Sequence, residues 1–269
     1  MATAATATAE NDKPAAGDPP VLEARGIVKR FGHVEALRGA DFTVGKGEVV
    51  ALIGDNGAGK STLIKTLSGV HAPDEGEIRV GGRPVHFATP VDARRAGVET
   101  VYQDLAVADD LSVAANLYLG REILRSGPLG RLGLLDKRAM RQGAAAALAE
   151  LGVRIPRVTT PIAMLSGGQR QCVAVARAII WATNVVILDE PTAALGVVQT
   201  GRVLDVVRRA RDAGMSVVLV SHNMPQVLEI ADRVEVLRLG RRAARLRADE
   251  VTTDDLVAAM TGSSGAERD

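Results

Sequence analysis

The stretch GDNGAGKST at Gly54–Thr62 constrains the fold more than any other part of the sequence. It has G-x-x-x-x-G-K-S spacing, between an apolar run at Val49–Ile53 and a helical pattern at Ser61–Leu67. Glycines let backbone N–H groups turn toward phosphate oxygens, and the helix N-terminus adds a favourable partial charge. The pattern predicts a phosphate-binding loop between a strand and a helix, with Lys60 at the terminal phosphates and Ser61 on Mg²⁺. The alternative, a glycine-rich turn with a solvated lysine, does not require that flanking pattern.

Composition limits the classes of protein that this loop can belong to. A length of 269 residues fits one large α/β domain or one domain with a small subdomain. Aromatic residues make up only 2%, so the core must be aliphatic, and a net charge of +1 gives no argument for nucleic acid. No apolar run approaches the roughly 20 residues that span a bilayer, which predicts no direct membrane insertion. A single cysteine, Cys172, excludes an internal disulfide.

Strand and helix patterns alternate along the rest of the chain. The segment DEGEIRVGGRPVHF predicts a hairpin that turns at Gly81-Gly82, and an alanine-rich stretch from Leu111 to about Leu151, broken by SGPLGRLG, predicts an inserted helical subdomain. Such alternation is typical of a largely parallel sheet covered on both faces. The predicted strands lie at 21–28, 40–44, 49–53, 98–102, 185–188, 216–220 and 234–237, and later helices at 167–181, 197–213 and 225–231.

A second glycine-containing motif, LSGGQ at Leu165–Gln169, precedes the helical run RQCVAVARAIIWA. Ser166 can cap that helix, and Gly167 and Gly168 expose backbone amides at its start. The segment therefore predicts a second anion-binding helix N-terminus, far in sequence from the first. Read alone, it could equally be an ordinary capped helix. We expect Cys172, inside this helix, to be a buried apolar thiol.

A third motif, VVILDEPTAALGV, is an apolar run that ends in two adjacent carboxylates, Asp189 and Glu190. It predicts a buried strand that delivers catalytic acids to the edge of the sheet. The alternative is a strand that merely leaves the core at a solvated end.

Taken in this order, the phosphate loop, LSGGQ and VVILDE resemble the ATP-binding subunit of an ABC transporter, over about Val21 to Gly262. The resemblance implies an α/β fold of the P-loop NTPase class, with an antiparallel β subdomain and an inserted helical subdomain. In that family, LSGGQ of one subunit covers the γ-phosphate held by the loop of its partner. The resemblance therefore implies a head-to-tail dimer with two ATP molecules in the interface. Each motif occurs once, so a second copy or a related subunit is needed.

The resemblance also implies roles for particular residues. Asp189 would hold Mg²⁺ with Ser61, Glu190 would be the general base, and His222 would contact the γ-phosphate. Gln103 would contact Mg²⁺ and the attacking water, and Phe31 would stack on adenine. The remaining ATP contacts are Gly54, Asp55, Asn56, Gly57, Ala58, Gly59, Lys60 and Thr62, with Ser166, Gly167, Gly168 and Gln169 acting on the partner's ATP.

Several functions within the ABC class remain open at this point. A chromosome-maintenance or repair ATPase would carry coiled coils or zinc modules between Gln103 and Leu165, where this chain has only about sixty residues. A translation-type ATPase normally has two cassettes in one chain. Transport is therefore favoured, with a non-hydrolysing regulatory subunit as the alternative from a different class. Glu190 and His222 argue against that alternative, and Gly196 argues mildly for it.

The segments at Val101–Glu122 and Ser221–Arg242 are similar to those of monosaccharide importers for ribose, xylose and fructose. A single cassette with EPTAALGV most resembles the fructose type, but residues of an ATP site never touch the sugar. The resemblance implies a membrane permease, an extracytoplasmic sugar-binding protein and a peripheral position on the cytoplasmic face of the membrane. Another small solute remains an alternative.

The predicted boundaries follow from composition. Residues 1–20 are rich in Ala, Thr and Pro without a secretory pattern, which predicts a disordered tail, and 263–269 predict a second tail. The ATP-binding domain is predicted at 21–262 and its helical subdomain at about 104–165. Family members usually carry an Asp where this chain has Gly196. That Asp would contact the opposite subunit, so we predict hydrolysis with weaker coupling between the two ATP sites.

Overall fold

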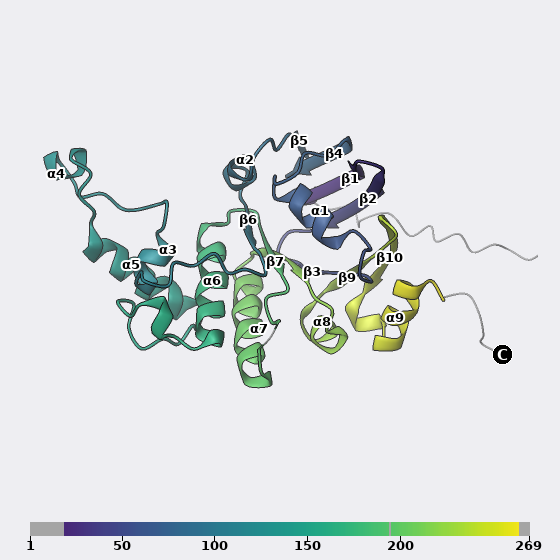
Figure 1. Ribbon diagram of the computed structural model, residues 1–269. Helices are drawn as coiled ribbons and strands as arrows, with labels where there is room; N and C mark the ends of the chain where they lie inside the picture. The colour runs from purple at the N-terminus through teal and green to yellow at the C-terminus, as the bar shows by residue number, and fades with distance from the viewer. Residues whose placement is uncertain (1–18, 194, 264–269) are drawn as a thin grey trace, which may run out of the picture.

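The computed structural model describes residues 19–193 and 195–263. The predicted tails at 1–20 and 263–269 therefore lie almost wholly outside the described residues. Two sheets form the centre of the molecule, with α3, α4 and α5 at one end (Figure 1). The larger sheet has the order β10-β9-β3-β8-β7-β6, and the smaller sheet has the order β2-β1-β4-β5.

The larger sheet is parallel except for its edge strand β10, which is antiparallel to β9. Every residue of β3 and β8 is buried, Ser216 included, because other elements cover both faces of the sheet. In β7, Val185 and Ile187 pack toward the smaller sheet, whereas Val186 and Leu188 pack toward the helical side. Its strands are β3 (Val49–Ile53), β6 (Val98–Val101), β7 (Val185–Asp189), β8 (Ser216–Val220), β9 (Arg233–Arg238) and β10 (Arg241–Arg247).

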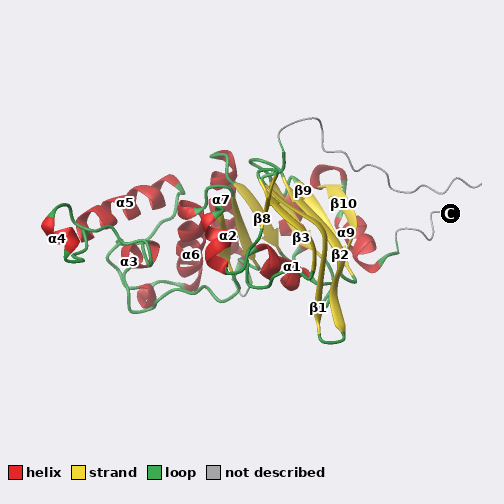
Figure 2. Cartoon of the chain, turned by 90° about the horizontal axis from the view of Figure 1, so that it is seen from above, coloured by secondary structure: helices red, strands yellow, loops and turns green. Residues whose placement is uncertain are grey.

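The smaller sheet is antiparallel and lies on one face of the larger one, with Phe42 and Phe87 buried in the shared core. Figure 2 shows the strands gathered at one side and the helices α3, α4 and α5 at the other. The sheet consists of β1 (Leu22–Phe31), β2 (Val34–Val44), β4 (Glu75–Val80) and β5 (Arg83–Val85). The hairpin predicted at Gly81-Gly82 is confirmed, because β4 and β5 pair directly across it.

Helices cover the larger sheet and form the lateral extension (Figure 1). They are α1 (Lys60–Leu67), α2 (Pro90–Arg95), α3 (Val113–Leu117), α4 (Pro128–Arg131), α5 (Lys137–Glu150), α6 (Gly167–Trp181), α7 (Val197–Asp212), α8 (Met224–Ile230) and α9 (Thr253–Thr261). Two short 3₁₀ helices lie at Ile162–Met164 and Ala248–Glu250. Among the described helices, none has the length and apolar character needed to cross a membrane.

Most predicted elements are confirmed, and the differences have local causes. The break predicted at SGPLGRLG is confirmed, and within it Pro128 at N1 begins the single turn of α4, which was not predicted. The sequence analysis missed α2, β10 and α9. Both missed helices begin with a capping box, Thr89 with Asp92 and Thr252 with Asp255. The strand predicted at 40–44 is longer, because β2 pairs with β1 from Val34 onward.

Candidate functional site

The phosphate loop connects β3 to α1, and its glycines are required by its shape. Gly54, Gly57 and Gly59 all have positive φ, at 155°, 80° and 105°. A Cβ at residue 54 would lie 2.2 Å from the carbonyl oxygen of Leu237, and one at residue 59 would lie 2.8 Å from that of Ala36. The loop can therefore pass against the backbone of its neighbours only where these side chains are missing.

The first turn of α1 is left open for an anion. Its N-cap is Gly59, in the left-handed conformation and without a side-chain hydrogen bond, so the first backbone N–H groups have no cap. Lys60 Nζ donates to the carbonyl oxygens of Gly54 at 2.7 Å and Asp55 at 3.0 Å, which draws the loop around the ammonium group. The loop opens into a cavity of about 450 Å³, and Asn56, Gly57, Ala58, Gly59, Lys60, Ser61 and Thr62 line it.

The aromatic position lies beside this cavity and does not line it. Phe31 ends β1, is 44% exposed, and meets the ring of His71 edge-on at 5.2 Å between centroids. Two apolar residues that the sequence analysis missed, Val34 and Leu239, line the cavity and are 66% and 65% exposed. Exposed aliphatic side chains at a phosphate loop offer contact area for the non-phosphate part of a nucleotide. Nothing in the sequence marks Leu239, because only the fold brings it to the loop.

The acidic pair lies at the carboxyl end of β7, two strands away from the phosphate loop. Glu190 has a φ of 53°, a left-handed conformation that costs a non-glycine residue about 1–3 kcal/mol. Its N–H donates to the carbonyl oxygen of Val220 at the end of β8 at 3.0 Å, which holds this backbone in place. Its carboxylate lies 2.9 Å from Nδ1 of His222, which follows β8 and is 74% exposed. The strained residue therefore aims one carboxylate oxygen at the histidine.

Electrostatics connects the acids to the phosphate loop. Burial, and then the neighbouring Glu190, raise the pKa of Asp189, against the charges of Lys60 and Lys65. Burial lowers the pKa of Lys60, against the charges of Glu190, Asp55 and Asp189. The fold thus brings together Lys60, Asp189, Glu190 and His222, which are dispersed over more than 160 positions of sequence. Lys60 and Asp189 are partly desolvated and carry opposite charges, as is typical of functional sites.

The residues available for a magnesium ion are few, and their chemistry fits. Ser61 offers a hydroxyl at the start of α1, and Asp189 a half-buried carboxylate. Within the described residues, no cluster of three or more His, Cys, Asp or Glu side chains could hold a metal without other ligands. Mg²⁺ suits such a set, because it usually takes one or two carboxylates together with substrate phosphates. Gln103 is exposed and lies two residues beyond β6, the neighbour of β7.

The loop that carries His222 is fixed by contacts that the sequence analysis missed. Ser221 Oγ accepts from the N–H of Asn223 at 3.1 Å, and the Asn223 side chain caps α8 by accepting from Gln226 at 3.2 Å. Gln226 in turn accepts from the hydroxyl of Thr192 at 2.8 Å, just after the acidic pair. An Asn directly before Met-Pro is typical of a helix N-cap, so this cap could have been predicted from the sequence. These bonds tie the segments after β7 and β8 together.

The LSGGQ segment, Leu165–Gln169, begins α6 in a different part of the molecule. Ser166 Oγ accepts from the N–H of Gln169, and the Gln169 side chain accepts from the N–H of Ser166, which forms a capping box. Ser166 and Gly167 are exposed, and Gly168 is buried against Gln199. None of these residues lines the cavity of the phosphate loop. One chain therefore brings the acids to the loop but leaves LSGGQ facing outward.

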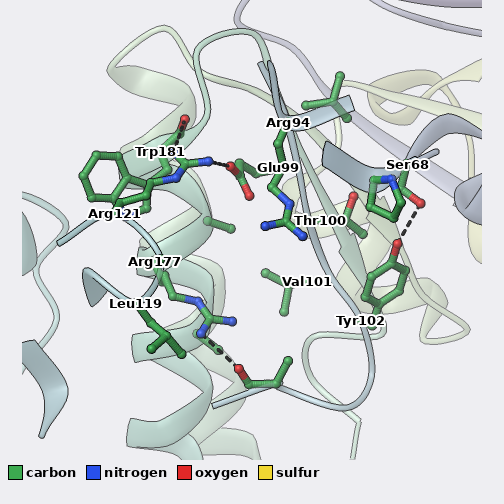
Figure 3. A pocket seen from close by; sticks show the side chains of 16 residues that line it. Ser68, Arg94, Glu99, Thr100, Val101, Tyr102, Leu119, Arg121, Arg177 and Trp181 are labelled. Carbon is green, nitrogen blue, oxygen red and sulfur yellow. Dashed lines mark hydrogen bonds and ion pairs between the residues drawn. The ribbon is translucent and has the colours of Figure 1, made fainter. Parts of the chain in front are cut away.

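A second cavity, of about 370 Å³, lies where β6 meets α6 and the segment at 119–121 (Figure 3). Arg94 and Arg177 extend into it, and Arg177 donates to the carbonyl oxygens of Ala106 at 3.0 Å and Leu105 at 3.3 Å. The buried hydroxyl of Thr100, also on its wall, has no hydrogen-bond partner among the described residues. Burial lowers the pKa of Arg177, and the charge of Arg94 acts in the same direction. The cavity already contains an acid, because Glu99 also lines it, and its charge opposes this lowering of the pKa of Arg177.

The phosphate loop after β3 and the acids after β7 define an α/β nucleotide-binding domain of the P-loop class. Comparison with known proteins narrows the class. Residues 37–193 match the family described as ABC transporter. The chain belongs to the ABC transporter family and is its ATP-binding cassette.

Two relatives are similar over nearly their whole length, and a third over about half of its length. The chain is 52% identical to a fructose import ATP-binding protein of Rhizobium meliloti, over 93% of this chain and 97% of that protein. It is 43% identical to a xylose/arabinose import ATP-binding protein of Sulfolobus acidocaldarius, over 90% and 94%. A ribose import ATP-binding protein of Rubrobacter xylanophilus is 45% identical over 91% of this chain, which spans 48% of that protein.

Solved structures agree with the family assignment. An ATP-binding cassette of an ABC transporter in its ADP conformation superimposes with a TM-score of 0.78 at 26% identity, covering 91% of this chain and 99% of that one. A nucleotide-free cassette of an ABC transporter gives a TM-score of 0.75 at 26% identity, covering 86% and 93%. The predicted fold class is therefore confirmed.

Proposed function

We propose that this cassette binds and hydrolyses ATP to energise a membrane importer for a monosaccharide. The observation that carries the proposal is the 52% identity to a fructose import ATP-binding protein over 97% of that relative. Relatives for xylose with arabinose and for ribose support sugar as the substrate class. Fructose itself is the first sugar to test, because the other two relatives are less similar. An importer for another small solute is the alternative.

The ATP site is assembled from the loop and the acids. The free amides of α1 and Lys60 bind the β- and γ-phosphates, and Phe31 with Val34 contacts the base. Mg²⁺, held by Ser61 and Asp189, would neutralise phosphate charge during transfer. Glu190 orients and deprotonates the attacking water. Nδ1 of His222 lies 2.9 Å from the Glu190 carboxylate and holds that carboxylate in position. Gln103, which would contact Mg²⁺ and the attacking water, links the ATP site to the helical subdomain predicted at 104–165.

A second subunit completes the site. The outward position of LSGGQ supports a head-to-tail dimer in which Ser166, Gly167, Gly168 and Gln169 cover the ATP of the partner. A homodimer satisfies this arrangement with one gene product, and a related second subunit would also satisfy it. Hydrolysis then removes the γ-phosphate that joins the two chains, and the dimer opens.

The partner in the membrane is a permease, which would hold this cassette on the cytoplasmic face. The cavity beside β6 and α6 supports a docking place for it, because the segment after Gln103 forms part of its wall through Ala106. A sugar-binding protein outside the membrane would deliver the substrate. ATP-driven closure then moves the helical subdomain against the permease and switches its access.

The experiment is reconstitution of this chain with its copurifying permease and binding protein, followed by ATPase assays with fructose, xylose and ribose. We expect stimulation by one sugar-loaded binding protein. A permease that copurifies without stimulation by any sugar would point to another solute, and the absence of any membrane partner would overturn the transport role. Glu190→Gln should abolish turnover and trap an ATP-bound dimer. If the wild-type chain binds ATP but does not hydrolyse it, a regulatory subunit would be favoured instead.

A further inference from the structure

A third cavity, of about 380 Å³, lies between the end of α5, the first turn of α6 and the middle of α7. These three helices lie next to one another in the lateral half of the molecule (Figure 1). The floor is apolar and comes from buried residues such as Val153 and Val206. A cavity of this volume has the size of a small-molecule site. It is separate from the phosphate-loop cavity, with which it shares no lining residue.

The wall of this cavity is positively charged. It includes three arginines, Arg154, Arg202 and Arg209, and one acid, Asp205. In the part of the chain that the structure describes, none of these three guanidinium groups forms a hydrogen bond or ion pair. Asp205 is already engaged, because its carboxylate lies 2.8 Å from Nη1 of Arg208 outside the cavity. Three guanidinium groups without a partner around one cavity leave room for a ligand with two negative charges.

The backbone is shaped to keep these arginines close to the cavity. Gly152 has a φ of 68°, and a Cβ there would lie 2.7 Å from Nε of Arg209. The glycine therefore allows the Arg209 side chain to lie directly on the backbone of the segment that follows α5. Arg202 and Arg209 are seven positions apart on α7, or about two helical turns, so they share one face of the helix.

The floor adds no charge of its own. Cys172 lies there, and burial raises the pKa of its thiol to about 11, with Arg202 acting in the opposite direction. The thiol is therefore protonated at neutral pH. A neutral floor under a cationic rim suits a molecule with a charged end and an uncharged body.

We propose that this cavity binds the phosphate group of a small organic phosphate and thereby regulates the cassette. Guanidinium groups bind phosphate oxygens through paired, charge-assisted hydrogen bonds, which a dianionic phosphomonoester can form with two arginines at once. Its uncharged body would occupy the floor beside Val153 and Cys172. Inorganic phosphate and pyrophosphate share the charge but lack this body.

The route to regulation is the LSGGQ segment. Gly168 and Gln169 line the cavity, and the side-chain amide of Gln169 donates to the carbonyl oxygen of Arg154 at 3.4 Å. An anion that binds Arg154 moves the residue to which Gln169 is bonded. The first turn of α6, which in the proposed dimer covers the ATP of the partner, then shifts with it. This regulatory half rests on the proposed function, whereas binding of the anion does not.

Binding is tested by calorimetry on the full chain with Mg²⁺ and a non-hydrolysable ATP analogue at saturation, so that the phosphate loop is filled. The probes are inorganic phosphate, pyrophosphate and a hexose phosphate. We expect one saturable site per chain, tightest for the hexose phosphate. Arg202→Gln with Arg209→Gln should weaken it at least tenfold. The control pair Arg138→Gln with Arg141→Gln removes the same charge from exposed positions of α5 and should change it less than twofold.

Three outcomes overturn the site: no saturable binding, equal loss in both pairs, or equal affinity for all three probes. The first removes the site, the second makes the attraction a diffuse surface effect, and the third makes it a site for free phosphate. Regulation is read from ATPase activity against hexose phosphate. We expect half-maximal change near the measured dissociation constant, absent in the Arg202 and Arg209 pair. Binding without that change overturns the regulatory half and leaves the transport proposal untouched.

Discussion

The helices α1 and α6 both begin with glycine-containing segments, but their first turns are completed in opposite ways. At α1 the N-cap is Gly59, and no side chain caps the helix. At α6, Ser166 and Gln169 cap each other's backbone amides. The first helix therefore has no side-chain cap on its N–H donors, whereas at the second the capping box occupies the N–H groups of Ser166 and Gln169 and leaves those of Gly167 and Gly168 uncapped.

This difference assigns nucleotide binding to α1 and a partner-dependent role to α6. An anion at α1 meets donors that lack a protein partner, with Lys60 beside them, so the phosphate loop can bind nucleotide in a single chain. An anion at α6 finds the N–H groups of Ser166 and Gln169 already used by the capping box and only those of Gly167 and Gly168 open, so we expect a weaker site that acts on a phosphate brought by the partner. The N-termini of these two helices therefore favour different roles: that of α1 binds ATP, and that of α6 senses the ATP bound by the partner.

The largest effect is expected from Gly59→Ala. Alanine there must adopt a φ of 105° and overlap the carbonyl oxygen of Ala36, so we expect a loss of about 3 kcal/mol in unfolding free energy and of ATP binding. Gly57→Ala is the control, because its φ is 80° but its Cβ would meet no atom within 4 Å. Urea unfolding and nucleotide titration measure both. Equal losses in the two variants would show that conformation alone, and no close contact, requires Gly59.

Gly167→Ala makes the same chemical change at the other helix, with a different expected result. A Cβ at this first helical position meets nothing within 4 Å, and alanine favours helix, so stability should stay equal or rise by up to about 1 kcal/mol. The added methyl would stand between α6 and the phosphate of the partner. We therefore expect turnover to fall at least tenfold while single-chain ATP binding is retained. Full turnover would contradict the sensing role of α6.

Ser166→Ala removes the cap of α6 and should cost about 1 kcal/mol, or roughly 2–4 °C in Tm. At α1 the N-cap is Gly59, so there is no capping side chain to remove. Ser166→Asp is the sharper variant, because aspartate caps a helix as well as serine does but repels an incoming phosphate. We expect its Tm to match the wild type and its turnover to fall. Thermal unfolding and ATPase assays separate the two contributions, and a normal turnover in Ser166→Asp would reject phosphate contact at this position.

Charge is the other contrast, because the charges of Glu190, Asp55 and Asp189 act on Lys60 at the start of α1, while no acid lies in the first turn of α6. The raised pKa of Asp189 means that its ionised form costs folding free energy above that pKa. Asp189→Asn should therefore raise Tm at pH 7, by roughly 1–3 °C, and abolish turnover. The gain should shrink as the pH falls through the pKa of Asp189 and vanish well below the ordinary value of about 3.9, where the carboxyl is protonated in both states. Asp55→Asn, at an exposed loop position, is the control and should show no such trend.

The sequence predicted β3, β8 and α6 with their observed bounds, because β3 is an apolar run, β8 is an apolar run preceded by Ser216, and α6 begins at a cap. It failed for β10, whose sequence RRAARLR has the polarity of a loop. In the fold, Arg245 of β10 pairs with Glu235 of β9, which is 1% exposed. Such an ion pair forms only after the two strands have paired, so no local sequence pattern predicts it.

The candidate site divides in the same way. Lys60, Asp189 and Glu190 were predictable because each ends or follows a strong local pattern, and parallel strands bring such ends to one edge. The role of His222 was predicted only from the family resemblance, and its contact with Glu190 was not predicted. Val34 and Leu239 were missed, since each reaches the cavity through the approach of a distant segment.

Gly196 offers the smallest and most specific test, since it begins α7 close to the acidic pair. It is the N-cap, without a side-chain bond, and its backbone at φ −73° and ψ 165° is open to any residue. Its glycine is therefore not required by conformation, and Gly196→Asp should add only a few tenths of a kcal/mol through capping. A Cβ would meet only the mobile end of Gln199, at 2.8 Å. The new carboxylate could accept hydrogen bonds across the proposed dimer, so the Hill coefficient for ATP should rise. An unchanged Hill coefficient with the expected gain in Tm would limit this residue to capping.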